Sequence, residues 1–397
     1  MEYKVIKGAD RLNSMYFSPV RQVMEKVAKV KEEGHNVVSF SVGEPDFNTP
    51  SRIKAETIAA IENNLTHYAP NRGVLSLRRQ ISDYLKAITK VTYQPEDEII
   101  LTGGGAEAIN NAFLAFIDPG DEVIVFSPCF MNYENMIAMA GGTMVDVPLV
   151  KEDGFQINPE KLRLAITDKT KMIVINNPCN PTGIVYRKDV LEQVAEIATE
   201  HNLLVFSDEI YCEITYDHTE FISIASFPGM KERTITMNGF SKAFAMTGWR
   251  LGILASSADI VTKLLLVHQY TTTCTPTFIQ HGLVAAMNSE QTLREKKEMV
   301  DAFARRRKLL LDGLDEIKGL SYILPMGAFY VFVDVSGTGM SGEEYSERLL
   351  YEKYVATVPG TKLGDKSGDF LRISYAASDD RIKEGLRRMK EFESAYA

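Results

Sequence analysis

The feature that most constrains the fold of this chain is an alternation of short apolar runs with amphipathic stretches through its middle. The pattern is typical of β-α units that build a parallel sheet with helices on its faces. Helical spacing is clear at 106–116 and 188–201, where apolar residues recur on one face. The expected strands are 98–102, 122–126, 172–176, 203–207, 234–237 and 251–255.

The last third of the chain mixes its elements differently and predicts a second, smaller α+β layer. We expect one long helical stretch at 278–317, strands at 329–335 and 370–374, and helices at 342–353 and from 379 onwards. The expected division is a segment 1–47 that joins the small domain, a large domain over 48–285, and the small domain over 286–397.

Composition disfavours several classes of protein. The net charge of −9 argues against nucleic acid or an anionic membrane surface as a main partner. The four cysteines are widely spaced and form no C-x-x-C pair, so neither a zinc site nor a disulfide framework is expected. No apolar run is long enough to span a membrane, and the N-terminus lacks the apolar core of a signal peptide. We therefore expect a cytoplasmic protein without a metal.

Three glycines at 103–105 follow the first expected strand and open a helix. Glycine lets the backbone approach a ligand, and free N–H groups at a helix N-terminus attract phosphate. The turn is neither G-x-G-x-x-G nor a Walker loop, so dinucleotide and nucleoside triphosphate binding lose support. Taken alone, it fits a tight turn without a ligand equally well.

Two later strands also end in polar residues. Asn180 lies in a turn with two prolines and could present its amide to a cleft, although such asparagines commonly satisfy their own backbone. Asp208 follows the strand at 203–207, where a buried carboxylate needs a partner such as a pyridinium nitrogen or a structural arginine. Glu209 would point to the opposite face if the strand continues.

Lys242 stands in a weakly charged stretch that holds the only tryptophan of the chain, which favours its burial. A desolvated lysine near positive charge has a lowered pKa and can attack an aldehyde. Arg250, eight residues later, could bind a phosphate in a bidentate manner.

In this order and with these separations, the motifs NPCNPTG, SDEIY and SKAFAMTGWRLG resemble the class I and II aminotransferases among the fold-type I pyridoxal-phosphate enzymes. The resemblance runs from about 39 to 375 and is to the aspartate and aromatic aminotransferase subgroup. It implies a large domain with a mostly parallel seven-stranded sheet, a smaller α+β domain, and pyridoxal 5′-phosphate as cofactor. It also implies ping-pong transfer of an amino group from an L-amino acid to a 2-oxo acid, with 2-oxoglutarate the expected acceptor.

The resemblance also implies roles for residues around the cofactor ring. Lys242 would hold the cofactor as a Schiff base and shuttle the proton between Cα and C4′. Asp208 would pair with the pyridinium nitrogen and keep the ring protonated. Tyr211 and Asn180 would hydrogen-bond the phenolic oxygen, and Phe130 matches the aromatic residue that stacks on the ring.

Further residues match the family's phosphate subsite. Gly105 and Ala106 would donate backbone N–H groups to the phosphate, with Arg250 supplying positive charge. Tyr68 matches a tyrosine that reaches the phosphate of the neighbouring subunit. That match implies a homodimer with shared active sites.

The substrate would be held by Arg372, which matches the arginine that grips the α-carboxylate, together with Asn180 and Gly43. Relatives that use aspartate often carry a lysine where this chain has Ala106. This difference weakens a strict aspartate assignment and leaves aromatic, aliphatic or other neutral amino acids open as donors beside aspartate.

Two other functions share part of this sequence pattern. A pyridoxal-phosphate C–S lyase that acts by β-elimination shares the fold, but such relatives tend to carry histidine where Tyr211 stands. A transcription regulator with an aminotransferase-like domain would need an added basic DNA-binding module. Here the family resemblance already begins near 39 in an acidic chain.

Overall fold

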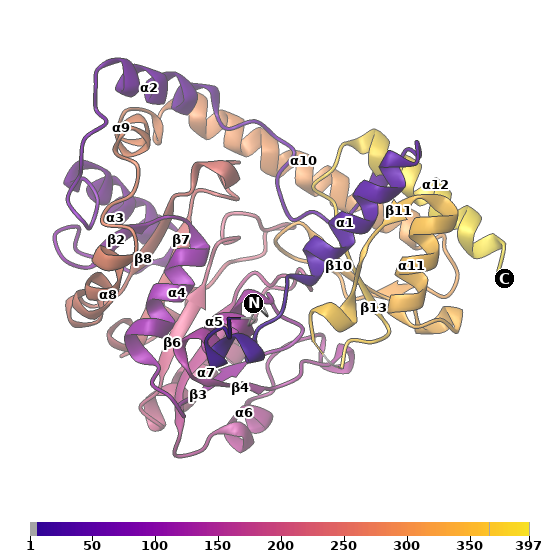
Figure 1. The fold of residues 1–397 in the computed structure, drawn as a ribbon, viewed down its shortest axis with the longest axis horizontal. Coiled ribbons are helices and arrows are strands. Elements are labelled where there is room, and N and C mark those ends of the chain that lie inside the picture. The colour runs from indigo at the N-terminus through magenta and orange to yellow at the C-terminus, as the bar shows by residue number, and fades with distance from the viewer. Residues whose placement is uncertain (1–5, 365, 397) are drawn as a thin grey trace, which may run out of the picture.

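The computed structural model describes residues 6–364 and 366–396. Two parts lie side by side in Figure 1, a larger one that contains most of the helices numbered α2 to α9 and a smaller one built mainly from the C-terminal third. Among the described residues, no helix is both long and apolar enough to cross a membrane.

The larger part is organised by a seven-stranded sheet in the order β2-β8-β7-β6-β5-β3-β4. Only β8 runs antiparallel to its neighbours, so the expectation of a mostly parallel seven-stranded sheet is confirmed. The edge strand β4 was not expected from the sequence. The bounds are β2 (Ile99–Thr102), β3 (Glu122–Val125), β4 (Thr143–Asp146), β5 (Thr170–Asn176), β6 (Leu204–Asp208), β7 (Thr234–Gly239) and β8 (Gly252–Ala255).

Helices cover both faces of this sheet, because successive strand residues point to opposite sides and both sides are apolar. In β3, for example, Val123 and Val125 pack in one cluster and Ile124 in another. The first face is covered by α4 (Gly105–Phe116), α5 (Asn132–Ala140) and α8 (Ala258–Thr271). The second is covered by α3 (Leu75–Thr89), α6 (Pro159–Ala165), α7 (Lys188–Glu200) and α9 (Thr277–Ala286), with α2 (Ser51–Glu62) packed on α9.

The smaller part contains an antiparallel sheet in the order β12-β13-β10-β9. Its strands are β9 (Ser321–Tyr322), β10 (Tyr330–Asp334), β12 (Val358–Pro359) and β13 (Phe370–Ser374), and its helices are α11 (Gly342–Lys353) and α12 (Asp379–Ser394). The N-terminal strand β1 (Val38–Ser39) pairs in parallel with β11 (Val355–Ala356), and α1 (Pro19–Glu32) packs beside it. Segments from both ends of the chain therefore share one layer.

The expected single helix at 278–317 is wrong, because the chain forms two helices there, α9 and α10 (Glu290–Leu314). Between them, the Ser289 hydroxyl accepts the backbone N–H of Thr292 and starts a new helix. The second helix then runs from α2 in the larger part to α12 in the smaller part (Figure 1).

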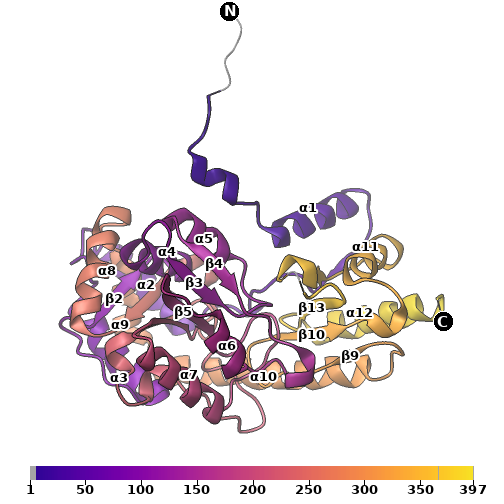
Figure 2. The same cartoon turned by 90° about the horizontal axis from the view of Figure 1, so that it is seen from below.

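Short 3-10 helices lie in the connections, and one of them precedes α1. Figure 2 shows this N-terminal stretch projecting from the body of the molecule before the chain enters α1. The 3-10 helices are η1 (Asp10–Ser14), η2 (Lys151–Asp153), η3 (Ile224–Ser226), η4 (Lys231–Arg233), η5 (Thr247–Trp249), η6 (Ser336–Thr338) and η7 (Gly360–Lys362).

Candidate active site

A cavity of ≈ 580 Å³ lies where the carboxyl ends of β5, β6 and β7 meet the start of α4. Parallel strands place their carboxyl ends at one edge of a sheet, which is where open α/β sheets bind ligands. Ten of the eleven residues predicted for the site line this cavity: Gly43, Gly105, Ala106, Phe130, Asn180, Asp208, Tyr211, Lys242, Arg250 and Arg372. Tyr68 does not line it and is 89% exposed.

Lys242 follows β7 and brings its amine to the centre of the cavity. Its Nζ donates a hydrogen bond of 2.6 Å to the carbonyl oxygen of Gly43 and lies near the rings of Tyr211 and Phe329. Burial lowers the pKa of Lys242 to about 8. About a tenth of the amine is therefore uncharged at pH 7, and about half at pH 8, and this form is available as a nucleophile.

Asp208 ends β6 and is buried. One carboxylate oxygen accepts the hydroxyl of Tyr133 at 2.6 Å, and the other accepts the backbone N–H of Ile210 at 3.2 Å. Burial raises the pKa of Asp208 to about 6 despite these two hydrogen bonds. Within the described residues Asp208 has no ion pair, so a ligand that brings a positive charge, such as a protonated pyridine nitrogen, would complete it.

The turn before α4 is shaped to leave room for Arg250. Gly104 has φ +92°, and a Cβ atom there would lie 2.8 Å from the Arg250 Cζ. The guanidinium donates to the carbonyl oxygens of Thr247 and Gly103 and has no carboxylate partner in the part of the chain that the structure describes. No side chain caps the N-terminus of α4, so an unopposed cation and free helix N–H groups meet at a place suited to a phosphate.

Arg372, on β13, supplies a second unopposed positive charge from the smaller part. It is 3% exposed, and its Nη atoms donate to the side chain of Asn180 at 3.2 Å and to the carbonyl oxygen of Ser41 at 2.6 Å. Its Nε is buried without a hydrogen-bond partner. A buried guanidinium with an unused donor and no described carboxylate nearby fits the carboxylate of a ligand.

Two tyrosines of the site were missed by sequence reasoning. Tyr133 holds Asp208, and Tyr330 bonds the hydroxyl of Tyr211 at 2.9 Å and lies under the Arg372 guanidinium. In the sequence, the only indication of a role for Tyr133 is that it stands three residues after Phe130, which was predicted to line the site. The cavity rim also includes Arg21 at the start of α1.

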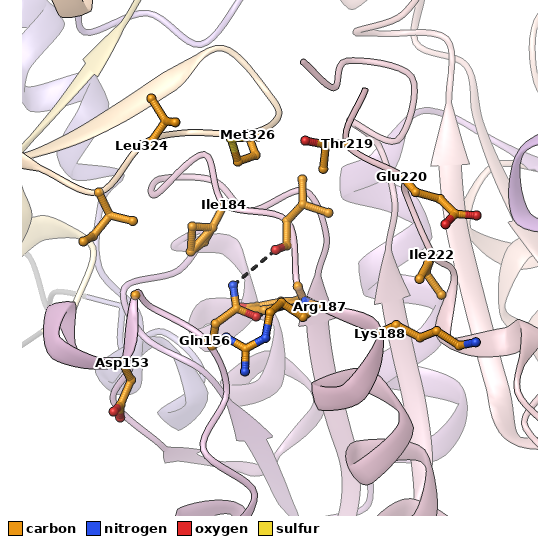
Figure 3. A pocket seen from close by; sticks show the side chains of 14 residues that line it. Asp153, Gln156, Ile184, Arg187, Lys188, Thr219, Glu220, Ile222, Leu324 and Met326 are labelled. Carbon is orange, nitrogen blue, oxygen red and sulfur yellow. Dashed lines mark hydrogen bonds between the residues drawn. The ribbon is translucent and has the colours of Figure 1, made fainter. Parts of the chain in front are cut away.

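Another cavity, of ≈ 470 Å³, lies between the loop before α7 and residues 323–326 of the smaller part (Figure 3). Two of its polar side chains, those of Gln156 and Arg187, already have partners. The Gln156 amide donates to the carbonyl of Val185 and accepts the N–H of Arg187, whose guanidinium bonds Asp189. No predicted site residue lines this cavity, which lacks the buried, unopposed charges of the larger one.

Comparison with known proteins gives a consistent family. Residues 35–389 match the family model of class I and II aminotransferases. The chain is 41% identical to an aspartate aminotransferase of Pyrococcus abyssi over 96% of its own length and 97% of the relative's. It is 39% identical to aromatic-amino-acid aminotransferase 2 of Thermococcus litoralis, again over 96% and 97%. The solved aspartate aminotransferase of Thermus thermophilus with maleate superposes with a TM-score of 0.92 at 38% identity, covering 98% of this chain and 100% of that one.

Glu209 lies beside Asp208 but does not line the cavity. It is buried, and one oxygen accepts the hydroxyls of Ser207 and Ser223 while the other has no hydrogen-bond partner. Burial raises the pKa of Glu209 to about 7. The protonated acid is therefore the form that the fold favours.

Because the folded-state pKa is raised, the contribution of Glu209 to stability is complete below pH 4.5 and is lost as the pH rises through 7. The loss amounts to about 3 kcal/mol. We predict that Glu209→Gln matches the wild type at pH 4.5 and unfolds at higher urea concentration than the wild type at pH 8. Glu192→Gln, on the exposed face of α7, is the control. Equal pH dependence in the wild type and Glu209→Gln would contradict the assignment.

Proposed function

Because the chain belongs to the class I and II aminotransferases, we propose that it moves the amino group of an L-amino acid to a 2-oxo acid, with pyridoxal 5′-phosphate held on Lys242. The observation that carries the proposal is the charge arrangement of one cavity. A half-buried amine lies among a buried carboxylate, Asp208, and two arginines, Arg250 and Arg372, and none of these three forms an ion pair in the described chain.

Each unopposed group matches one part of the cofactor or substrate. Asp208 would hold the ring nitrogen, and Arg250 with the N-terminus of α4 would hold the phosphate. Arg372 would then hold the substrate carboxylate. When bound, pyridoxal phosphate draws electrons from the substrate Cα and makes its proton acidic.

The protein's own residues would then transfer the proton and orient the cofactor. With its lowered pKa, the Nζ of Lys242 could take the proton from Cα and return it to C4′ of the cofactor. The Asn180 oxygen accepts from Arg372, which leaves the amide NH₂ group to donate to the phenolic oxygen of the cofactor. Tyr211 is proposed to donate to the same oxygen.

A ping-pong order is supported by the number of carboxylate subsites. Arg372 is the one buried guanidinium lining the described part of the cavity, so an amino acid and a 2-oxo acid would compete for it. They would therefore react in turn, with the amino group stored on the enzyme between the two half-reactions.

The reaction type is tested by the absorbance spectrum of the holoenzyme as single L-amino acids are added. Conversion of the lysine-bound cofactor band to that of the aminated cofactor, reversed by 2-oxoglutarate, is the expected result, and the panel ranks aspartate against aromatic and other neutral donors. Release of pyruvate and ammonia without a 2-oxo acid would instead establish a C–S lyase.

Replacing Lys242 by alanine removes the amine that binds the cofactor and carries the proton. We predict that Lys242→Ala loses the lysine-bound cofactor band and at least about 10³-fold of turnover, since nucleophile and base are lost together. Circular dichroism serves as the control for folding. Turnover near the wild-type rate would overturn the role of Lys242.

The acceptor is proposed to be 2-oxoglutarate, which carries two carboxylates. The cavity offers Arg372 for one of them, and Arg21 at its rim for the other. Arg21 is exposed and has no ion pair in the described chain. Ala106 supplies no charge at this rim, so Arg21 would set the preference for dicarboxylic substrates.

We predict that Arg21→Ala raises KM for 2-oxoglutarate about threefold to fivefold, the effect expected for an exposed ion pair. KM for pyruvate, which has a single carboxylate, should be unchanged. Lys29→Ala is the matched control, since Lys29 is an exposed cation on the same helix that does not line the cavity. An equal change with both acceptors would reject this role of Arg21.

A homodimer with shared sites is proposed from the family resemblance at Tyr68 and from exposed aromatic residues. Tyr68, Tyr270 and Phe17 are 89%, 88% and 88% exposed, and a partner subunit would cover such apolar surface. In a dimer, Tyr68 of one protomer would complete the phosphate subsite of the other.

Shared sites make a specific prediction about mixed dimers. Tyr68→Phe removes one phosphate hydrogen bond and should weaken pyridoxal 5′-phosphate binding about tenfold. When Tyr68→Phe and Lys242→Ala protomers are mixed, one site of each mixed dimer has both residues intact. Titration of the mixture with cofactor should then show a population of sites with wild-type affinity. Persistence of the weak affinity alone would place Tyr68 within its own subunit's site, or outside the site altogether.

A further inference from the structure

A buried histidine and glutamate lie behind the turn that opens α4. Glu107, in the first turn of the helix, accepts the backbone N–H of Gly103 at 2.5 Å through one oxygen. Its other oxygen accepts from the Asn111 side chain at 2.9 Å and lies 2.7 Å from Nδ1 of His268. His268, on α8, is completely buried, and its Nε2 lies 2.8 Å from the carbonyl oxygen of Asn71.

The partners of the imidazole define which nitrogens carry protons. A carbonyl oxygen only accepts hydrogen bonds, so Nε2 must carry a proton. Glu107 accepts at both oxygens, and its pKa is lowered: burial acts to raise it, but the hydrogen bonds from His268 and Gly103 outweigh burial. A proton must also lie between Nδ1 and the Glu107 oxygen, because two lone pairs would otherwise face each other at 2.7 Å. With its proton on Nε2, His268 therefore forms with Glu107 a pair that carries no net charge.

Both backbone groups of Gly103 are hydrogen-bonded, its N–H to Glu107 and, at 3.3 Å, its carbonyl oxygen to Arg250. The next residue, Gly104, has φ +92° and leads into the uncapped helix N-terminus. An unbalanced carboxylate at this position would repel a phosphate dianion, whereas the neutral pair leaves the helix N–H groups and Arg250 to attract it.

We propose that His268 is a positioning residue for the phosphate subsite, acting through Glu107 to balance its charge and to fix the Gly103 turn. The inference rests on the proposed use of pyridoxal 5′-phosphate. His268 does not line the cavity and touches neither the cofactor nor the substrate in this role. Its effect is on the affinity for the phosphate group, not on the chemistry at Lys242.

The test compares pyridoxal 5′-phosphate with pyridoxal, which has the same aldehyde and ring but no phosphate. Dissociation constants are measured from the lysine-bound absorbance band without substrate. His268→Gln should weaken pyridoxal 5′-phosphate binding about tenfold or more and leave pyridoxal binding within twofold. His281→Gln, on α9, is the control and should change neither.

A second variant separates charge balance from packing. In the double variant Glu107→Gln/His268→Gln the unbalanced carboxylate is gone, so most of the lost phosphate affinity should return. A double variant as weak as His268→Gln, or equal weakening of pyridoxal and its phosphate, would overturn the proposal. Wild-type protein that binds neither aldehyde would instead reject the proposed cofactor.

The protonation state can be measured without any substitution at the pair. In wild-type protein labelled with ¹⁵N-histidine, slowly exchanging protons should be found on Nε2 of His268 and in the hydrogen bond between Nδ1 and Glu107. This readout holds even if His268→Gln fails to fold. Absence of a proton from the Nδ1 hydrogen bond would overturn the charge assignment.

Discussion

Charge compensation is the constraint on which the site depends. Asp208, Arg250 and Arg372 all lack an ion pair in the described chain, and for the two buried groups, Asp208 and Arg372, leaving the charge unpaired costs free energy. The fold tolerates this because neutral partners, namely the Tyr133 hydroxyl and backbone carbonyl groups, partly solvate each charge. A ligand that brings a charge opposite to each of these three groups therefore gains affinity, because it supplies the partners that the protein lacks.

The parallel sheet makes this arrangement possible. Asn176, Asp208 and Gly239 are the last residues of three neighbouring strands, so residues far apart in sequence arrive at one edge. Arg372 comes from the smaller part of the molecule, lines the same cavity and donates a hydrogen bond to Asn180. The subsite proposed for the substrate is thus divided between the two parts of the molecule, while the subsites proposed for the ring and phosphate belong to the larger part.

Sequence patterns predicted most of the sheet because its strands are buried on both faces and read as apolar runs. They missed β4, whose residues are exposed or half-buried at the sheet edge and carry little apolar signal. They also joined α9 to α10, because the cap at Ser289 is one hydroxyl in an otherwise continuous helical pattern. Ten of the predicted site residues line one cavity. Several of them belong to motifs that come directly after strands, and the carboxyl ends of these strands meet at one edge of the sheet. Tyr133 and Tyr330 escaped because their roles depend on distances across the fold.

The long helix α10 has a mechanical consequence. With 25 residues it is a nearly rigid rod of about 37 Å that packs on α2 at one end and α12 at the other. A tilt of about 5° at the first end displaces the second by about 3 Å, given this length. Leu310 and Leu311 of the rod pack in the same cluster as Leu371 and Ile373, which flank Arg372. A change in the angle of this helix would therefore shift the strand that carries Arg372 relative to the larger part of the molecule.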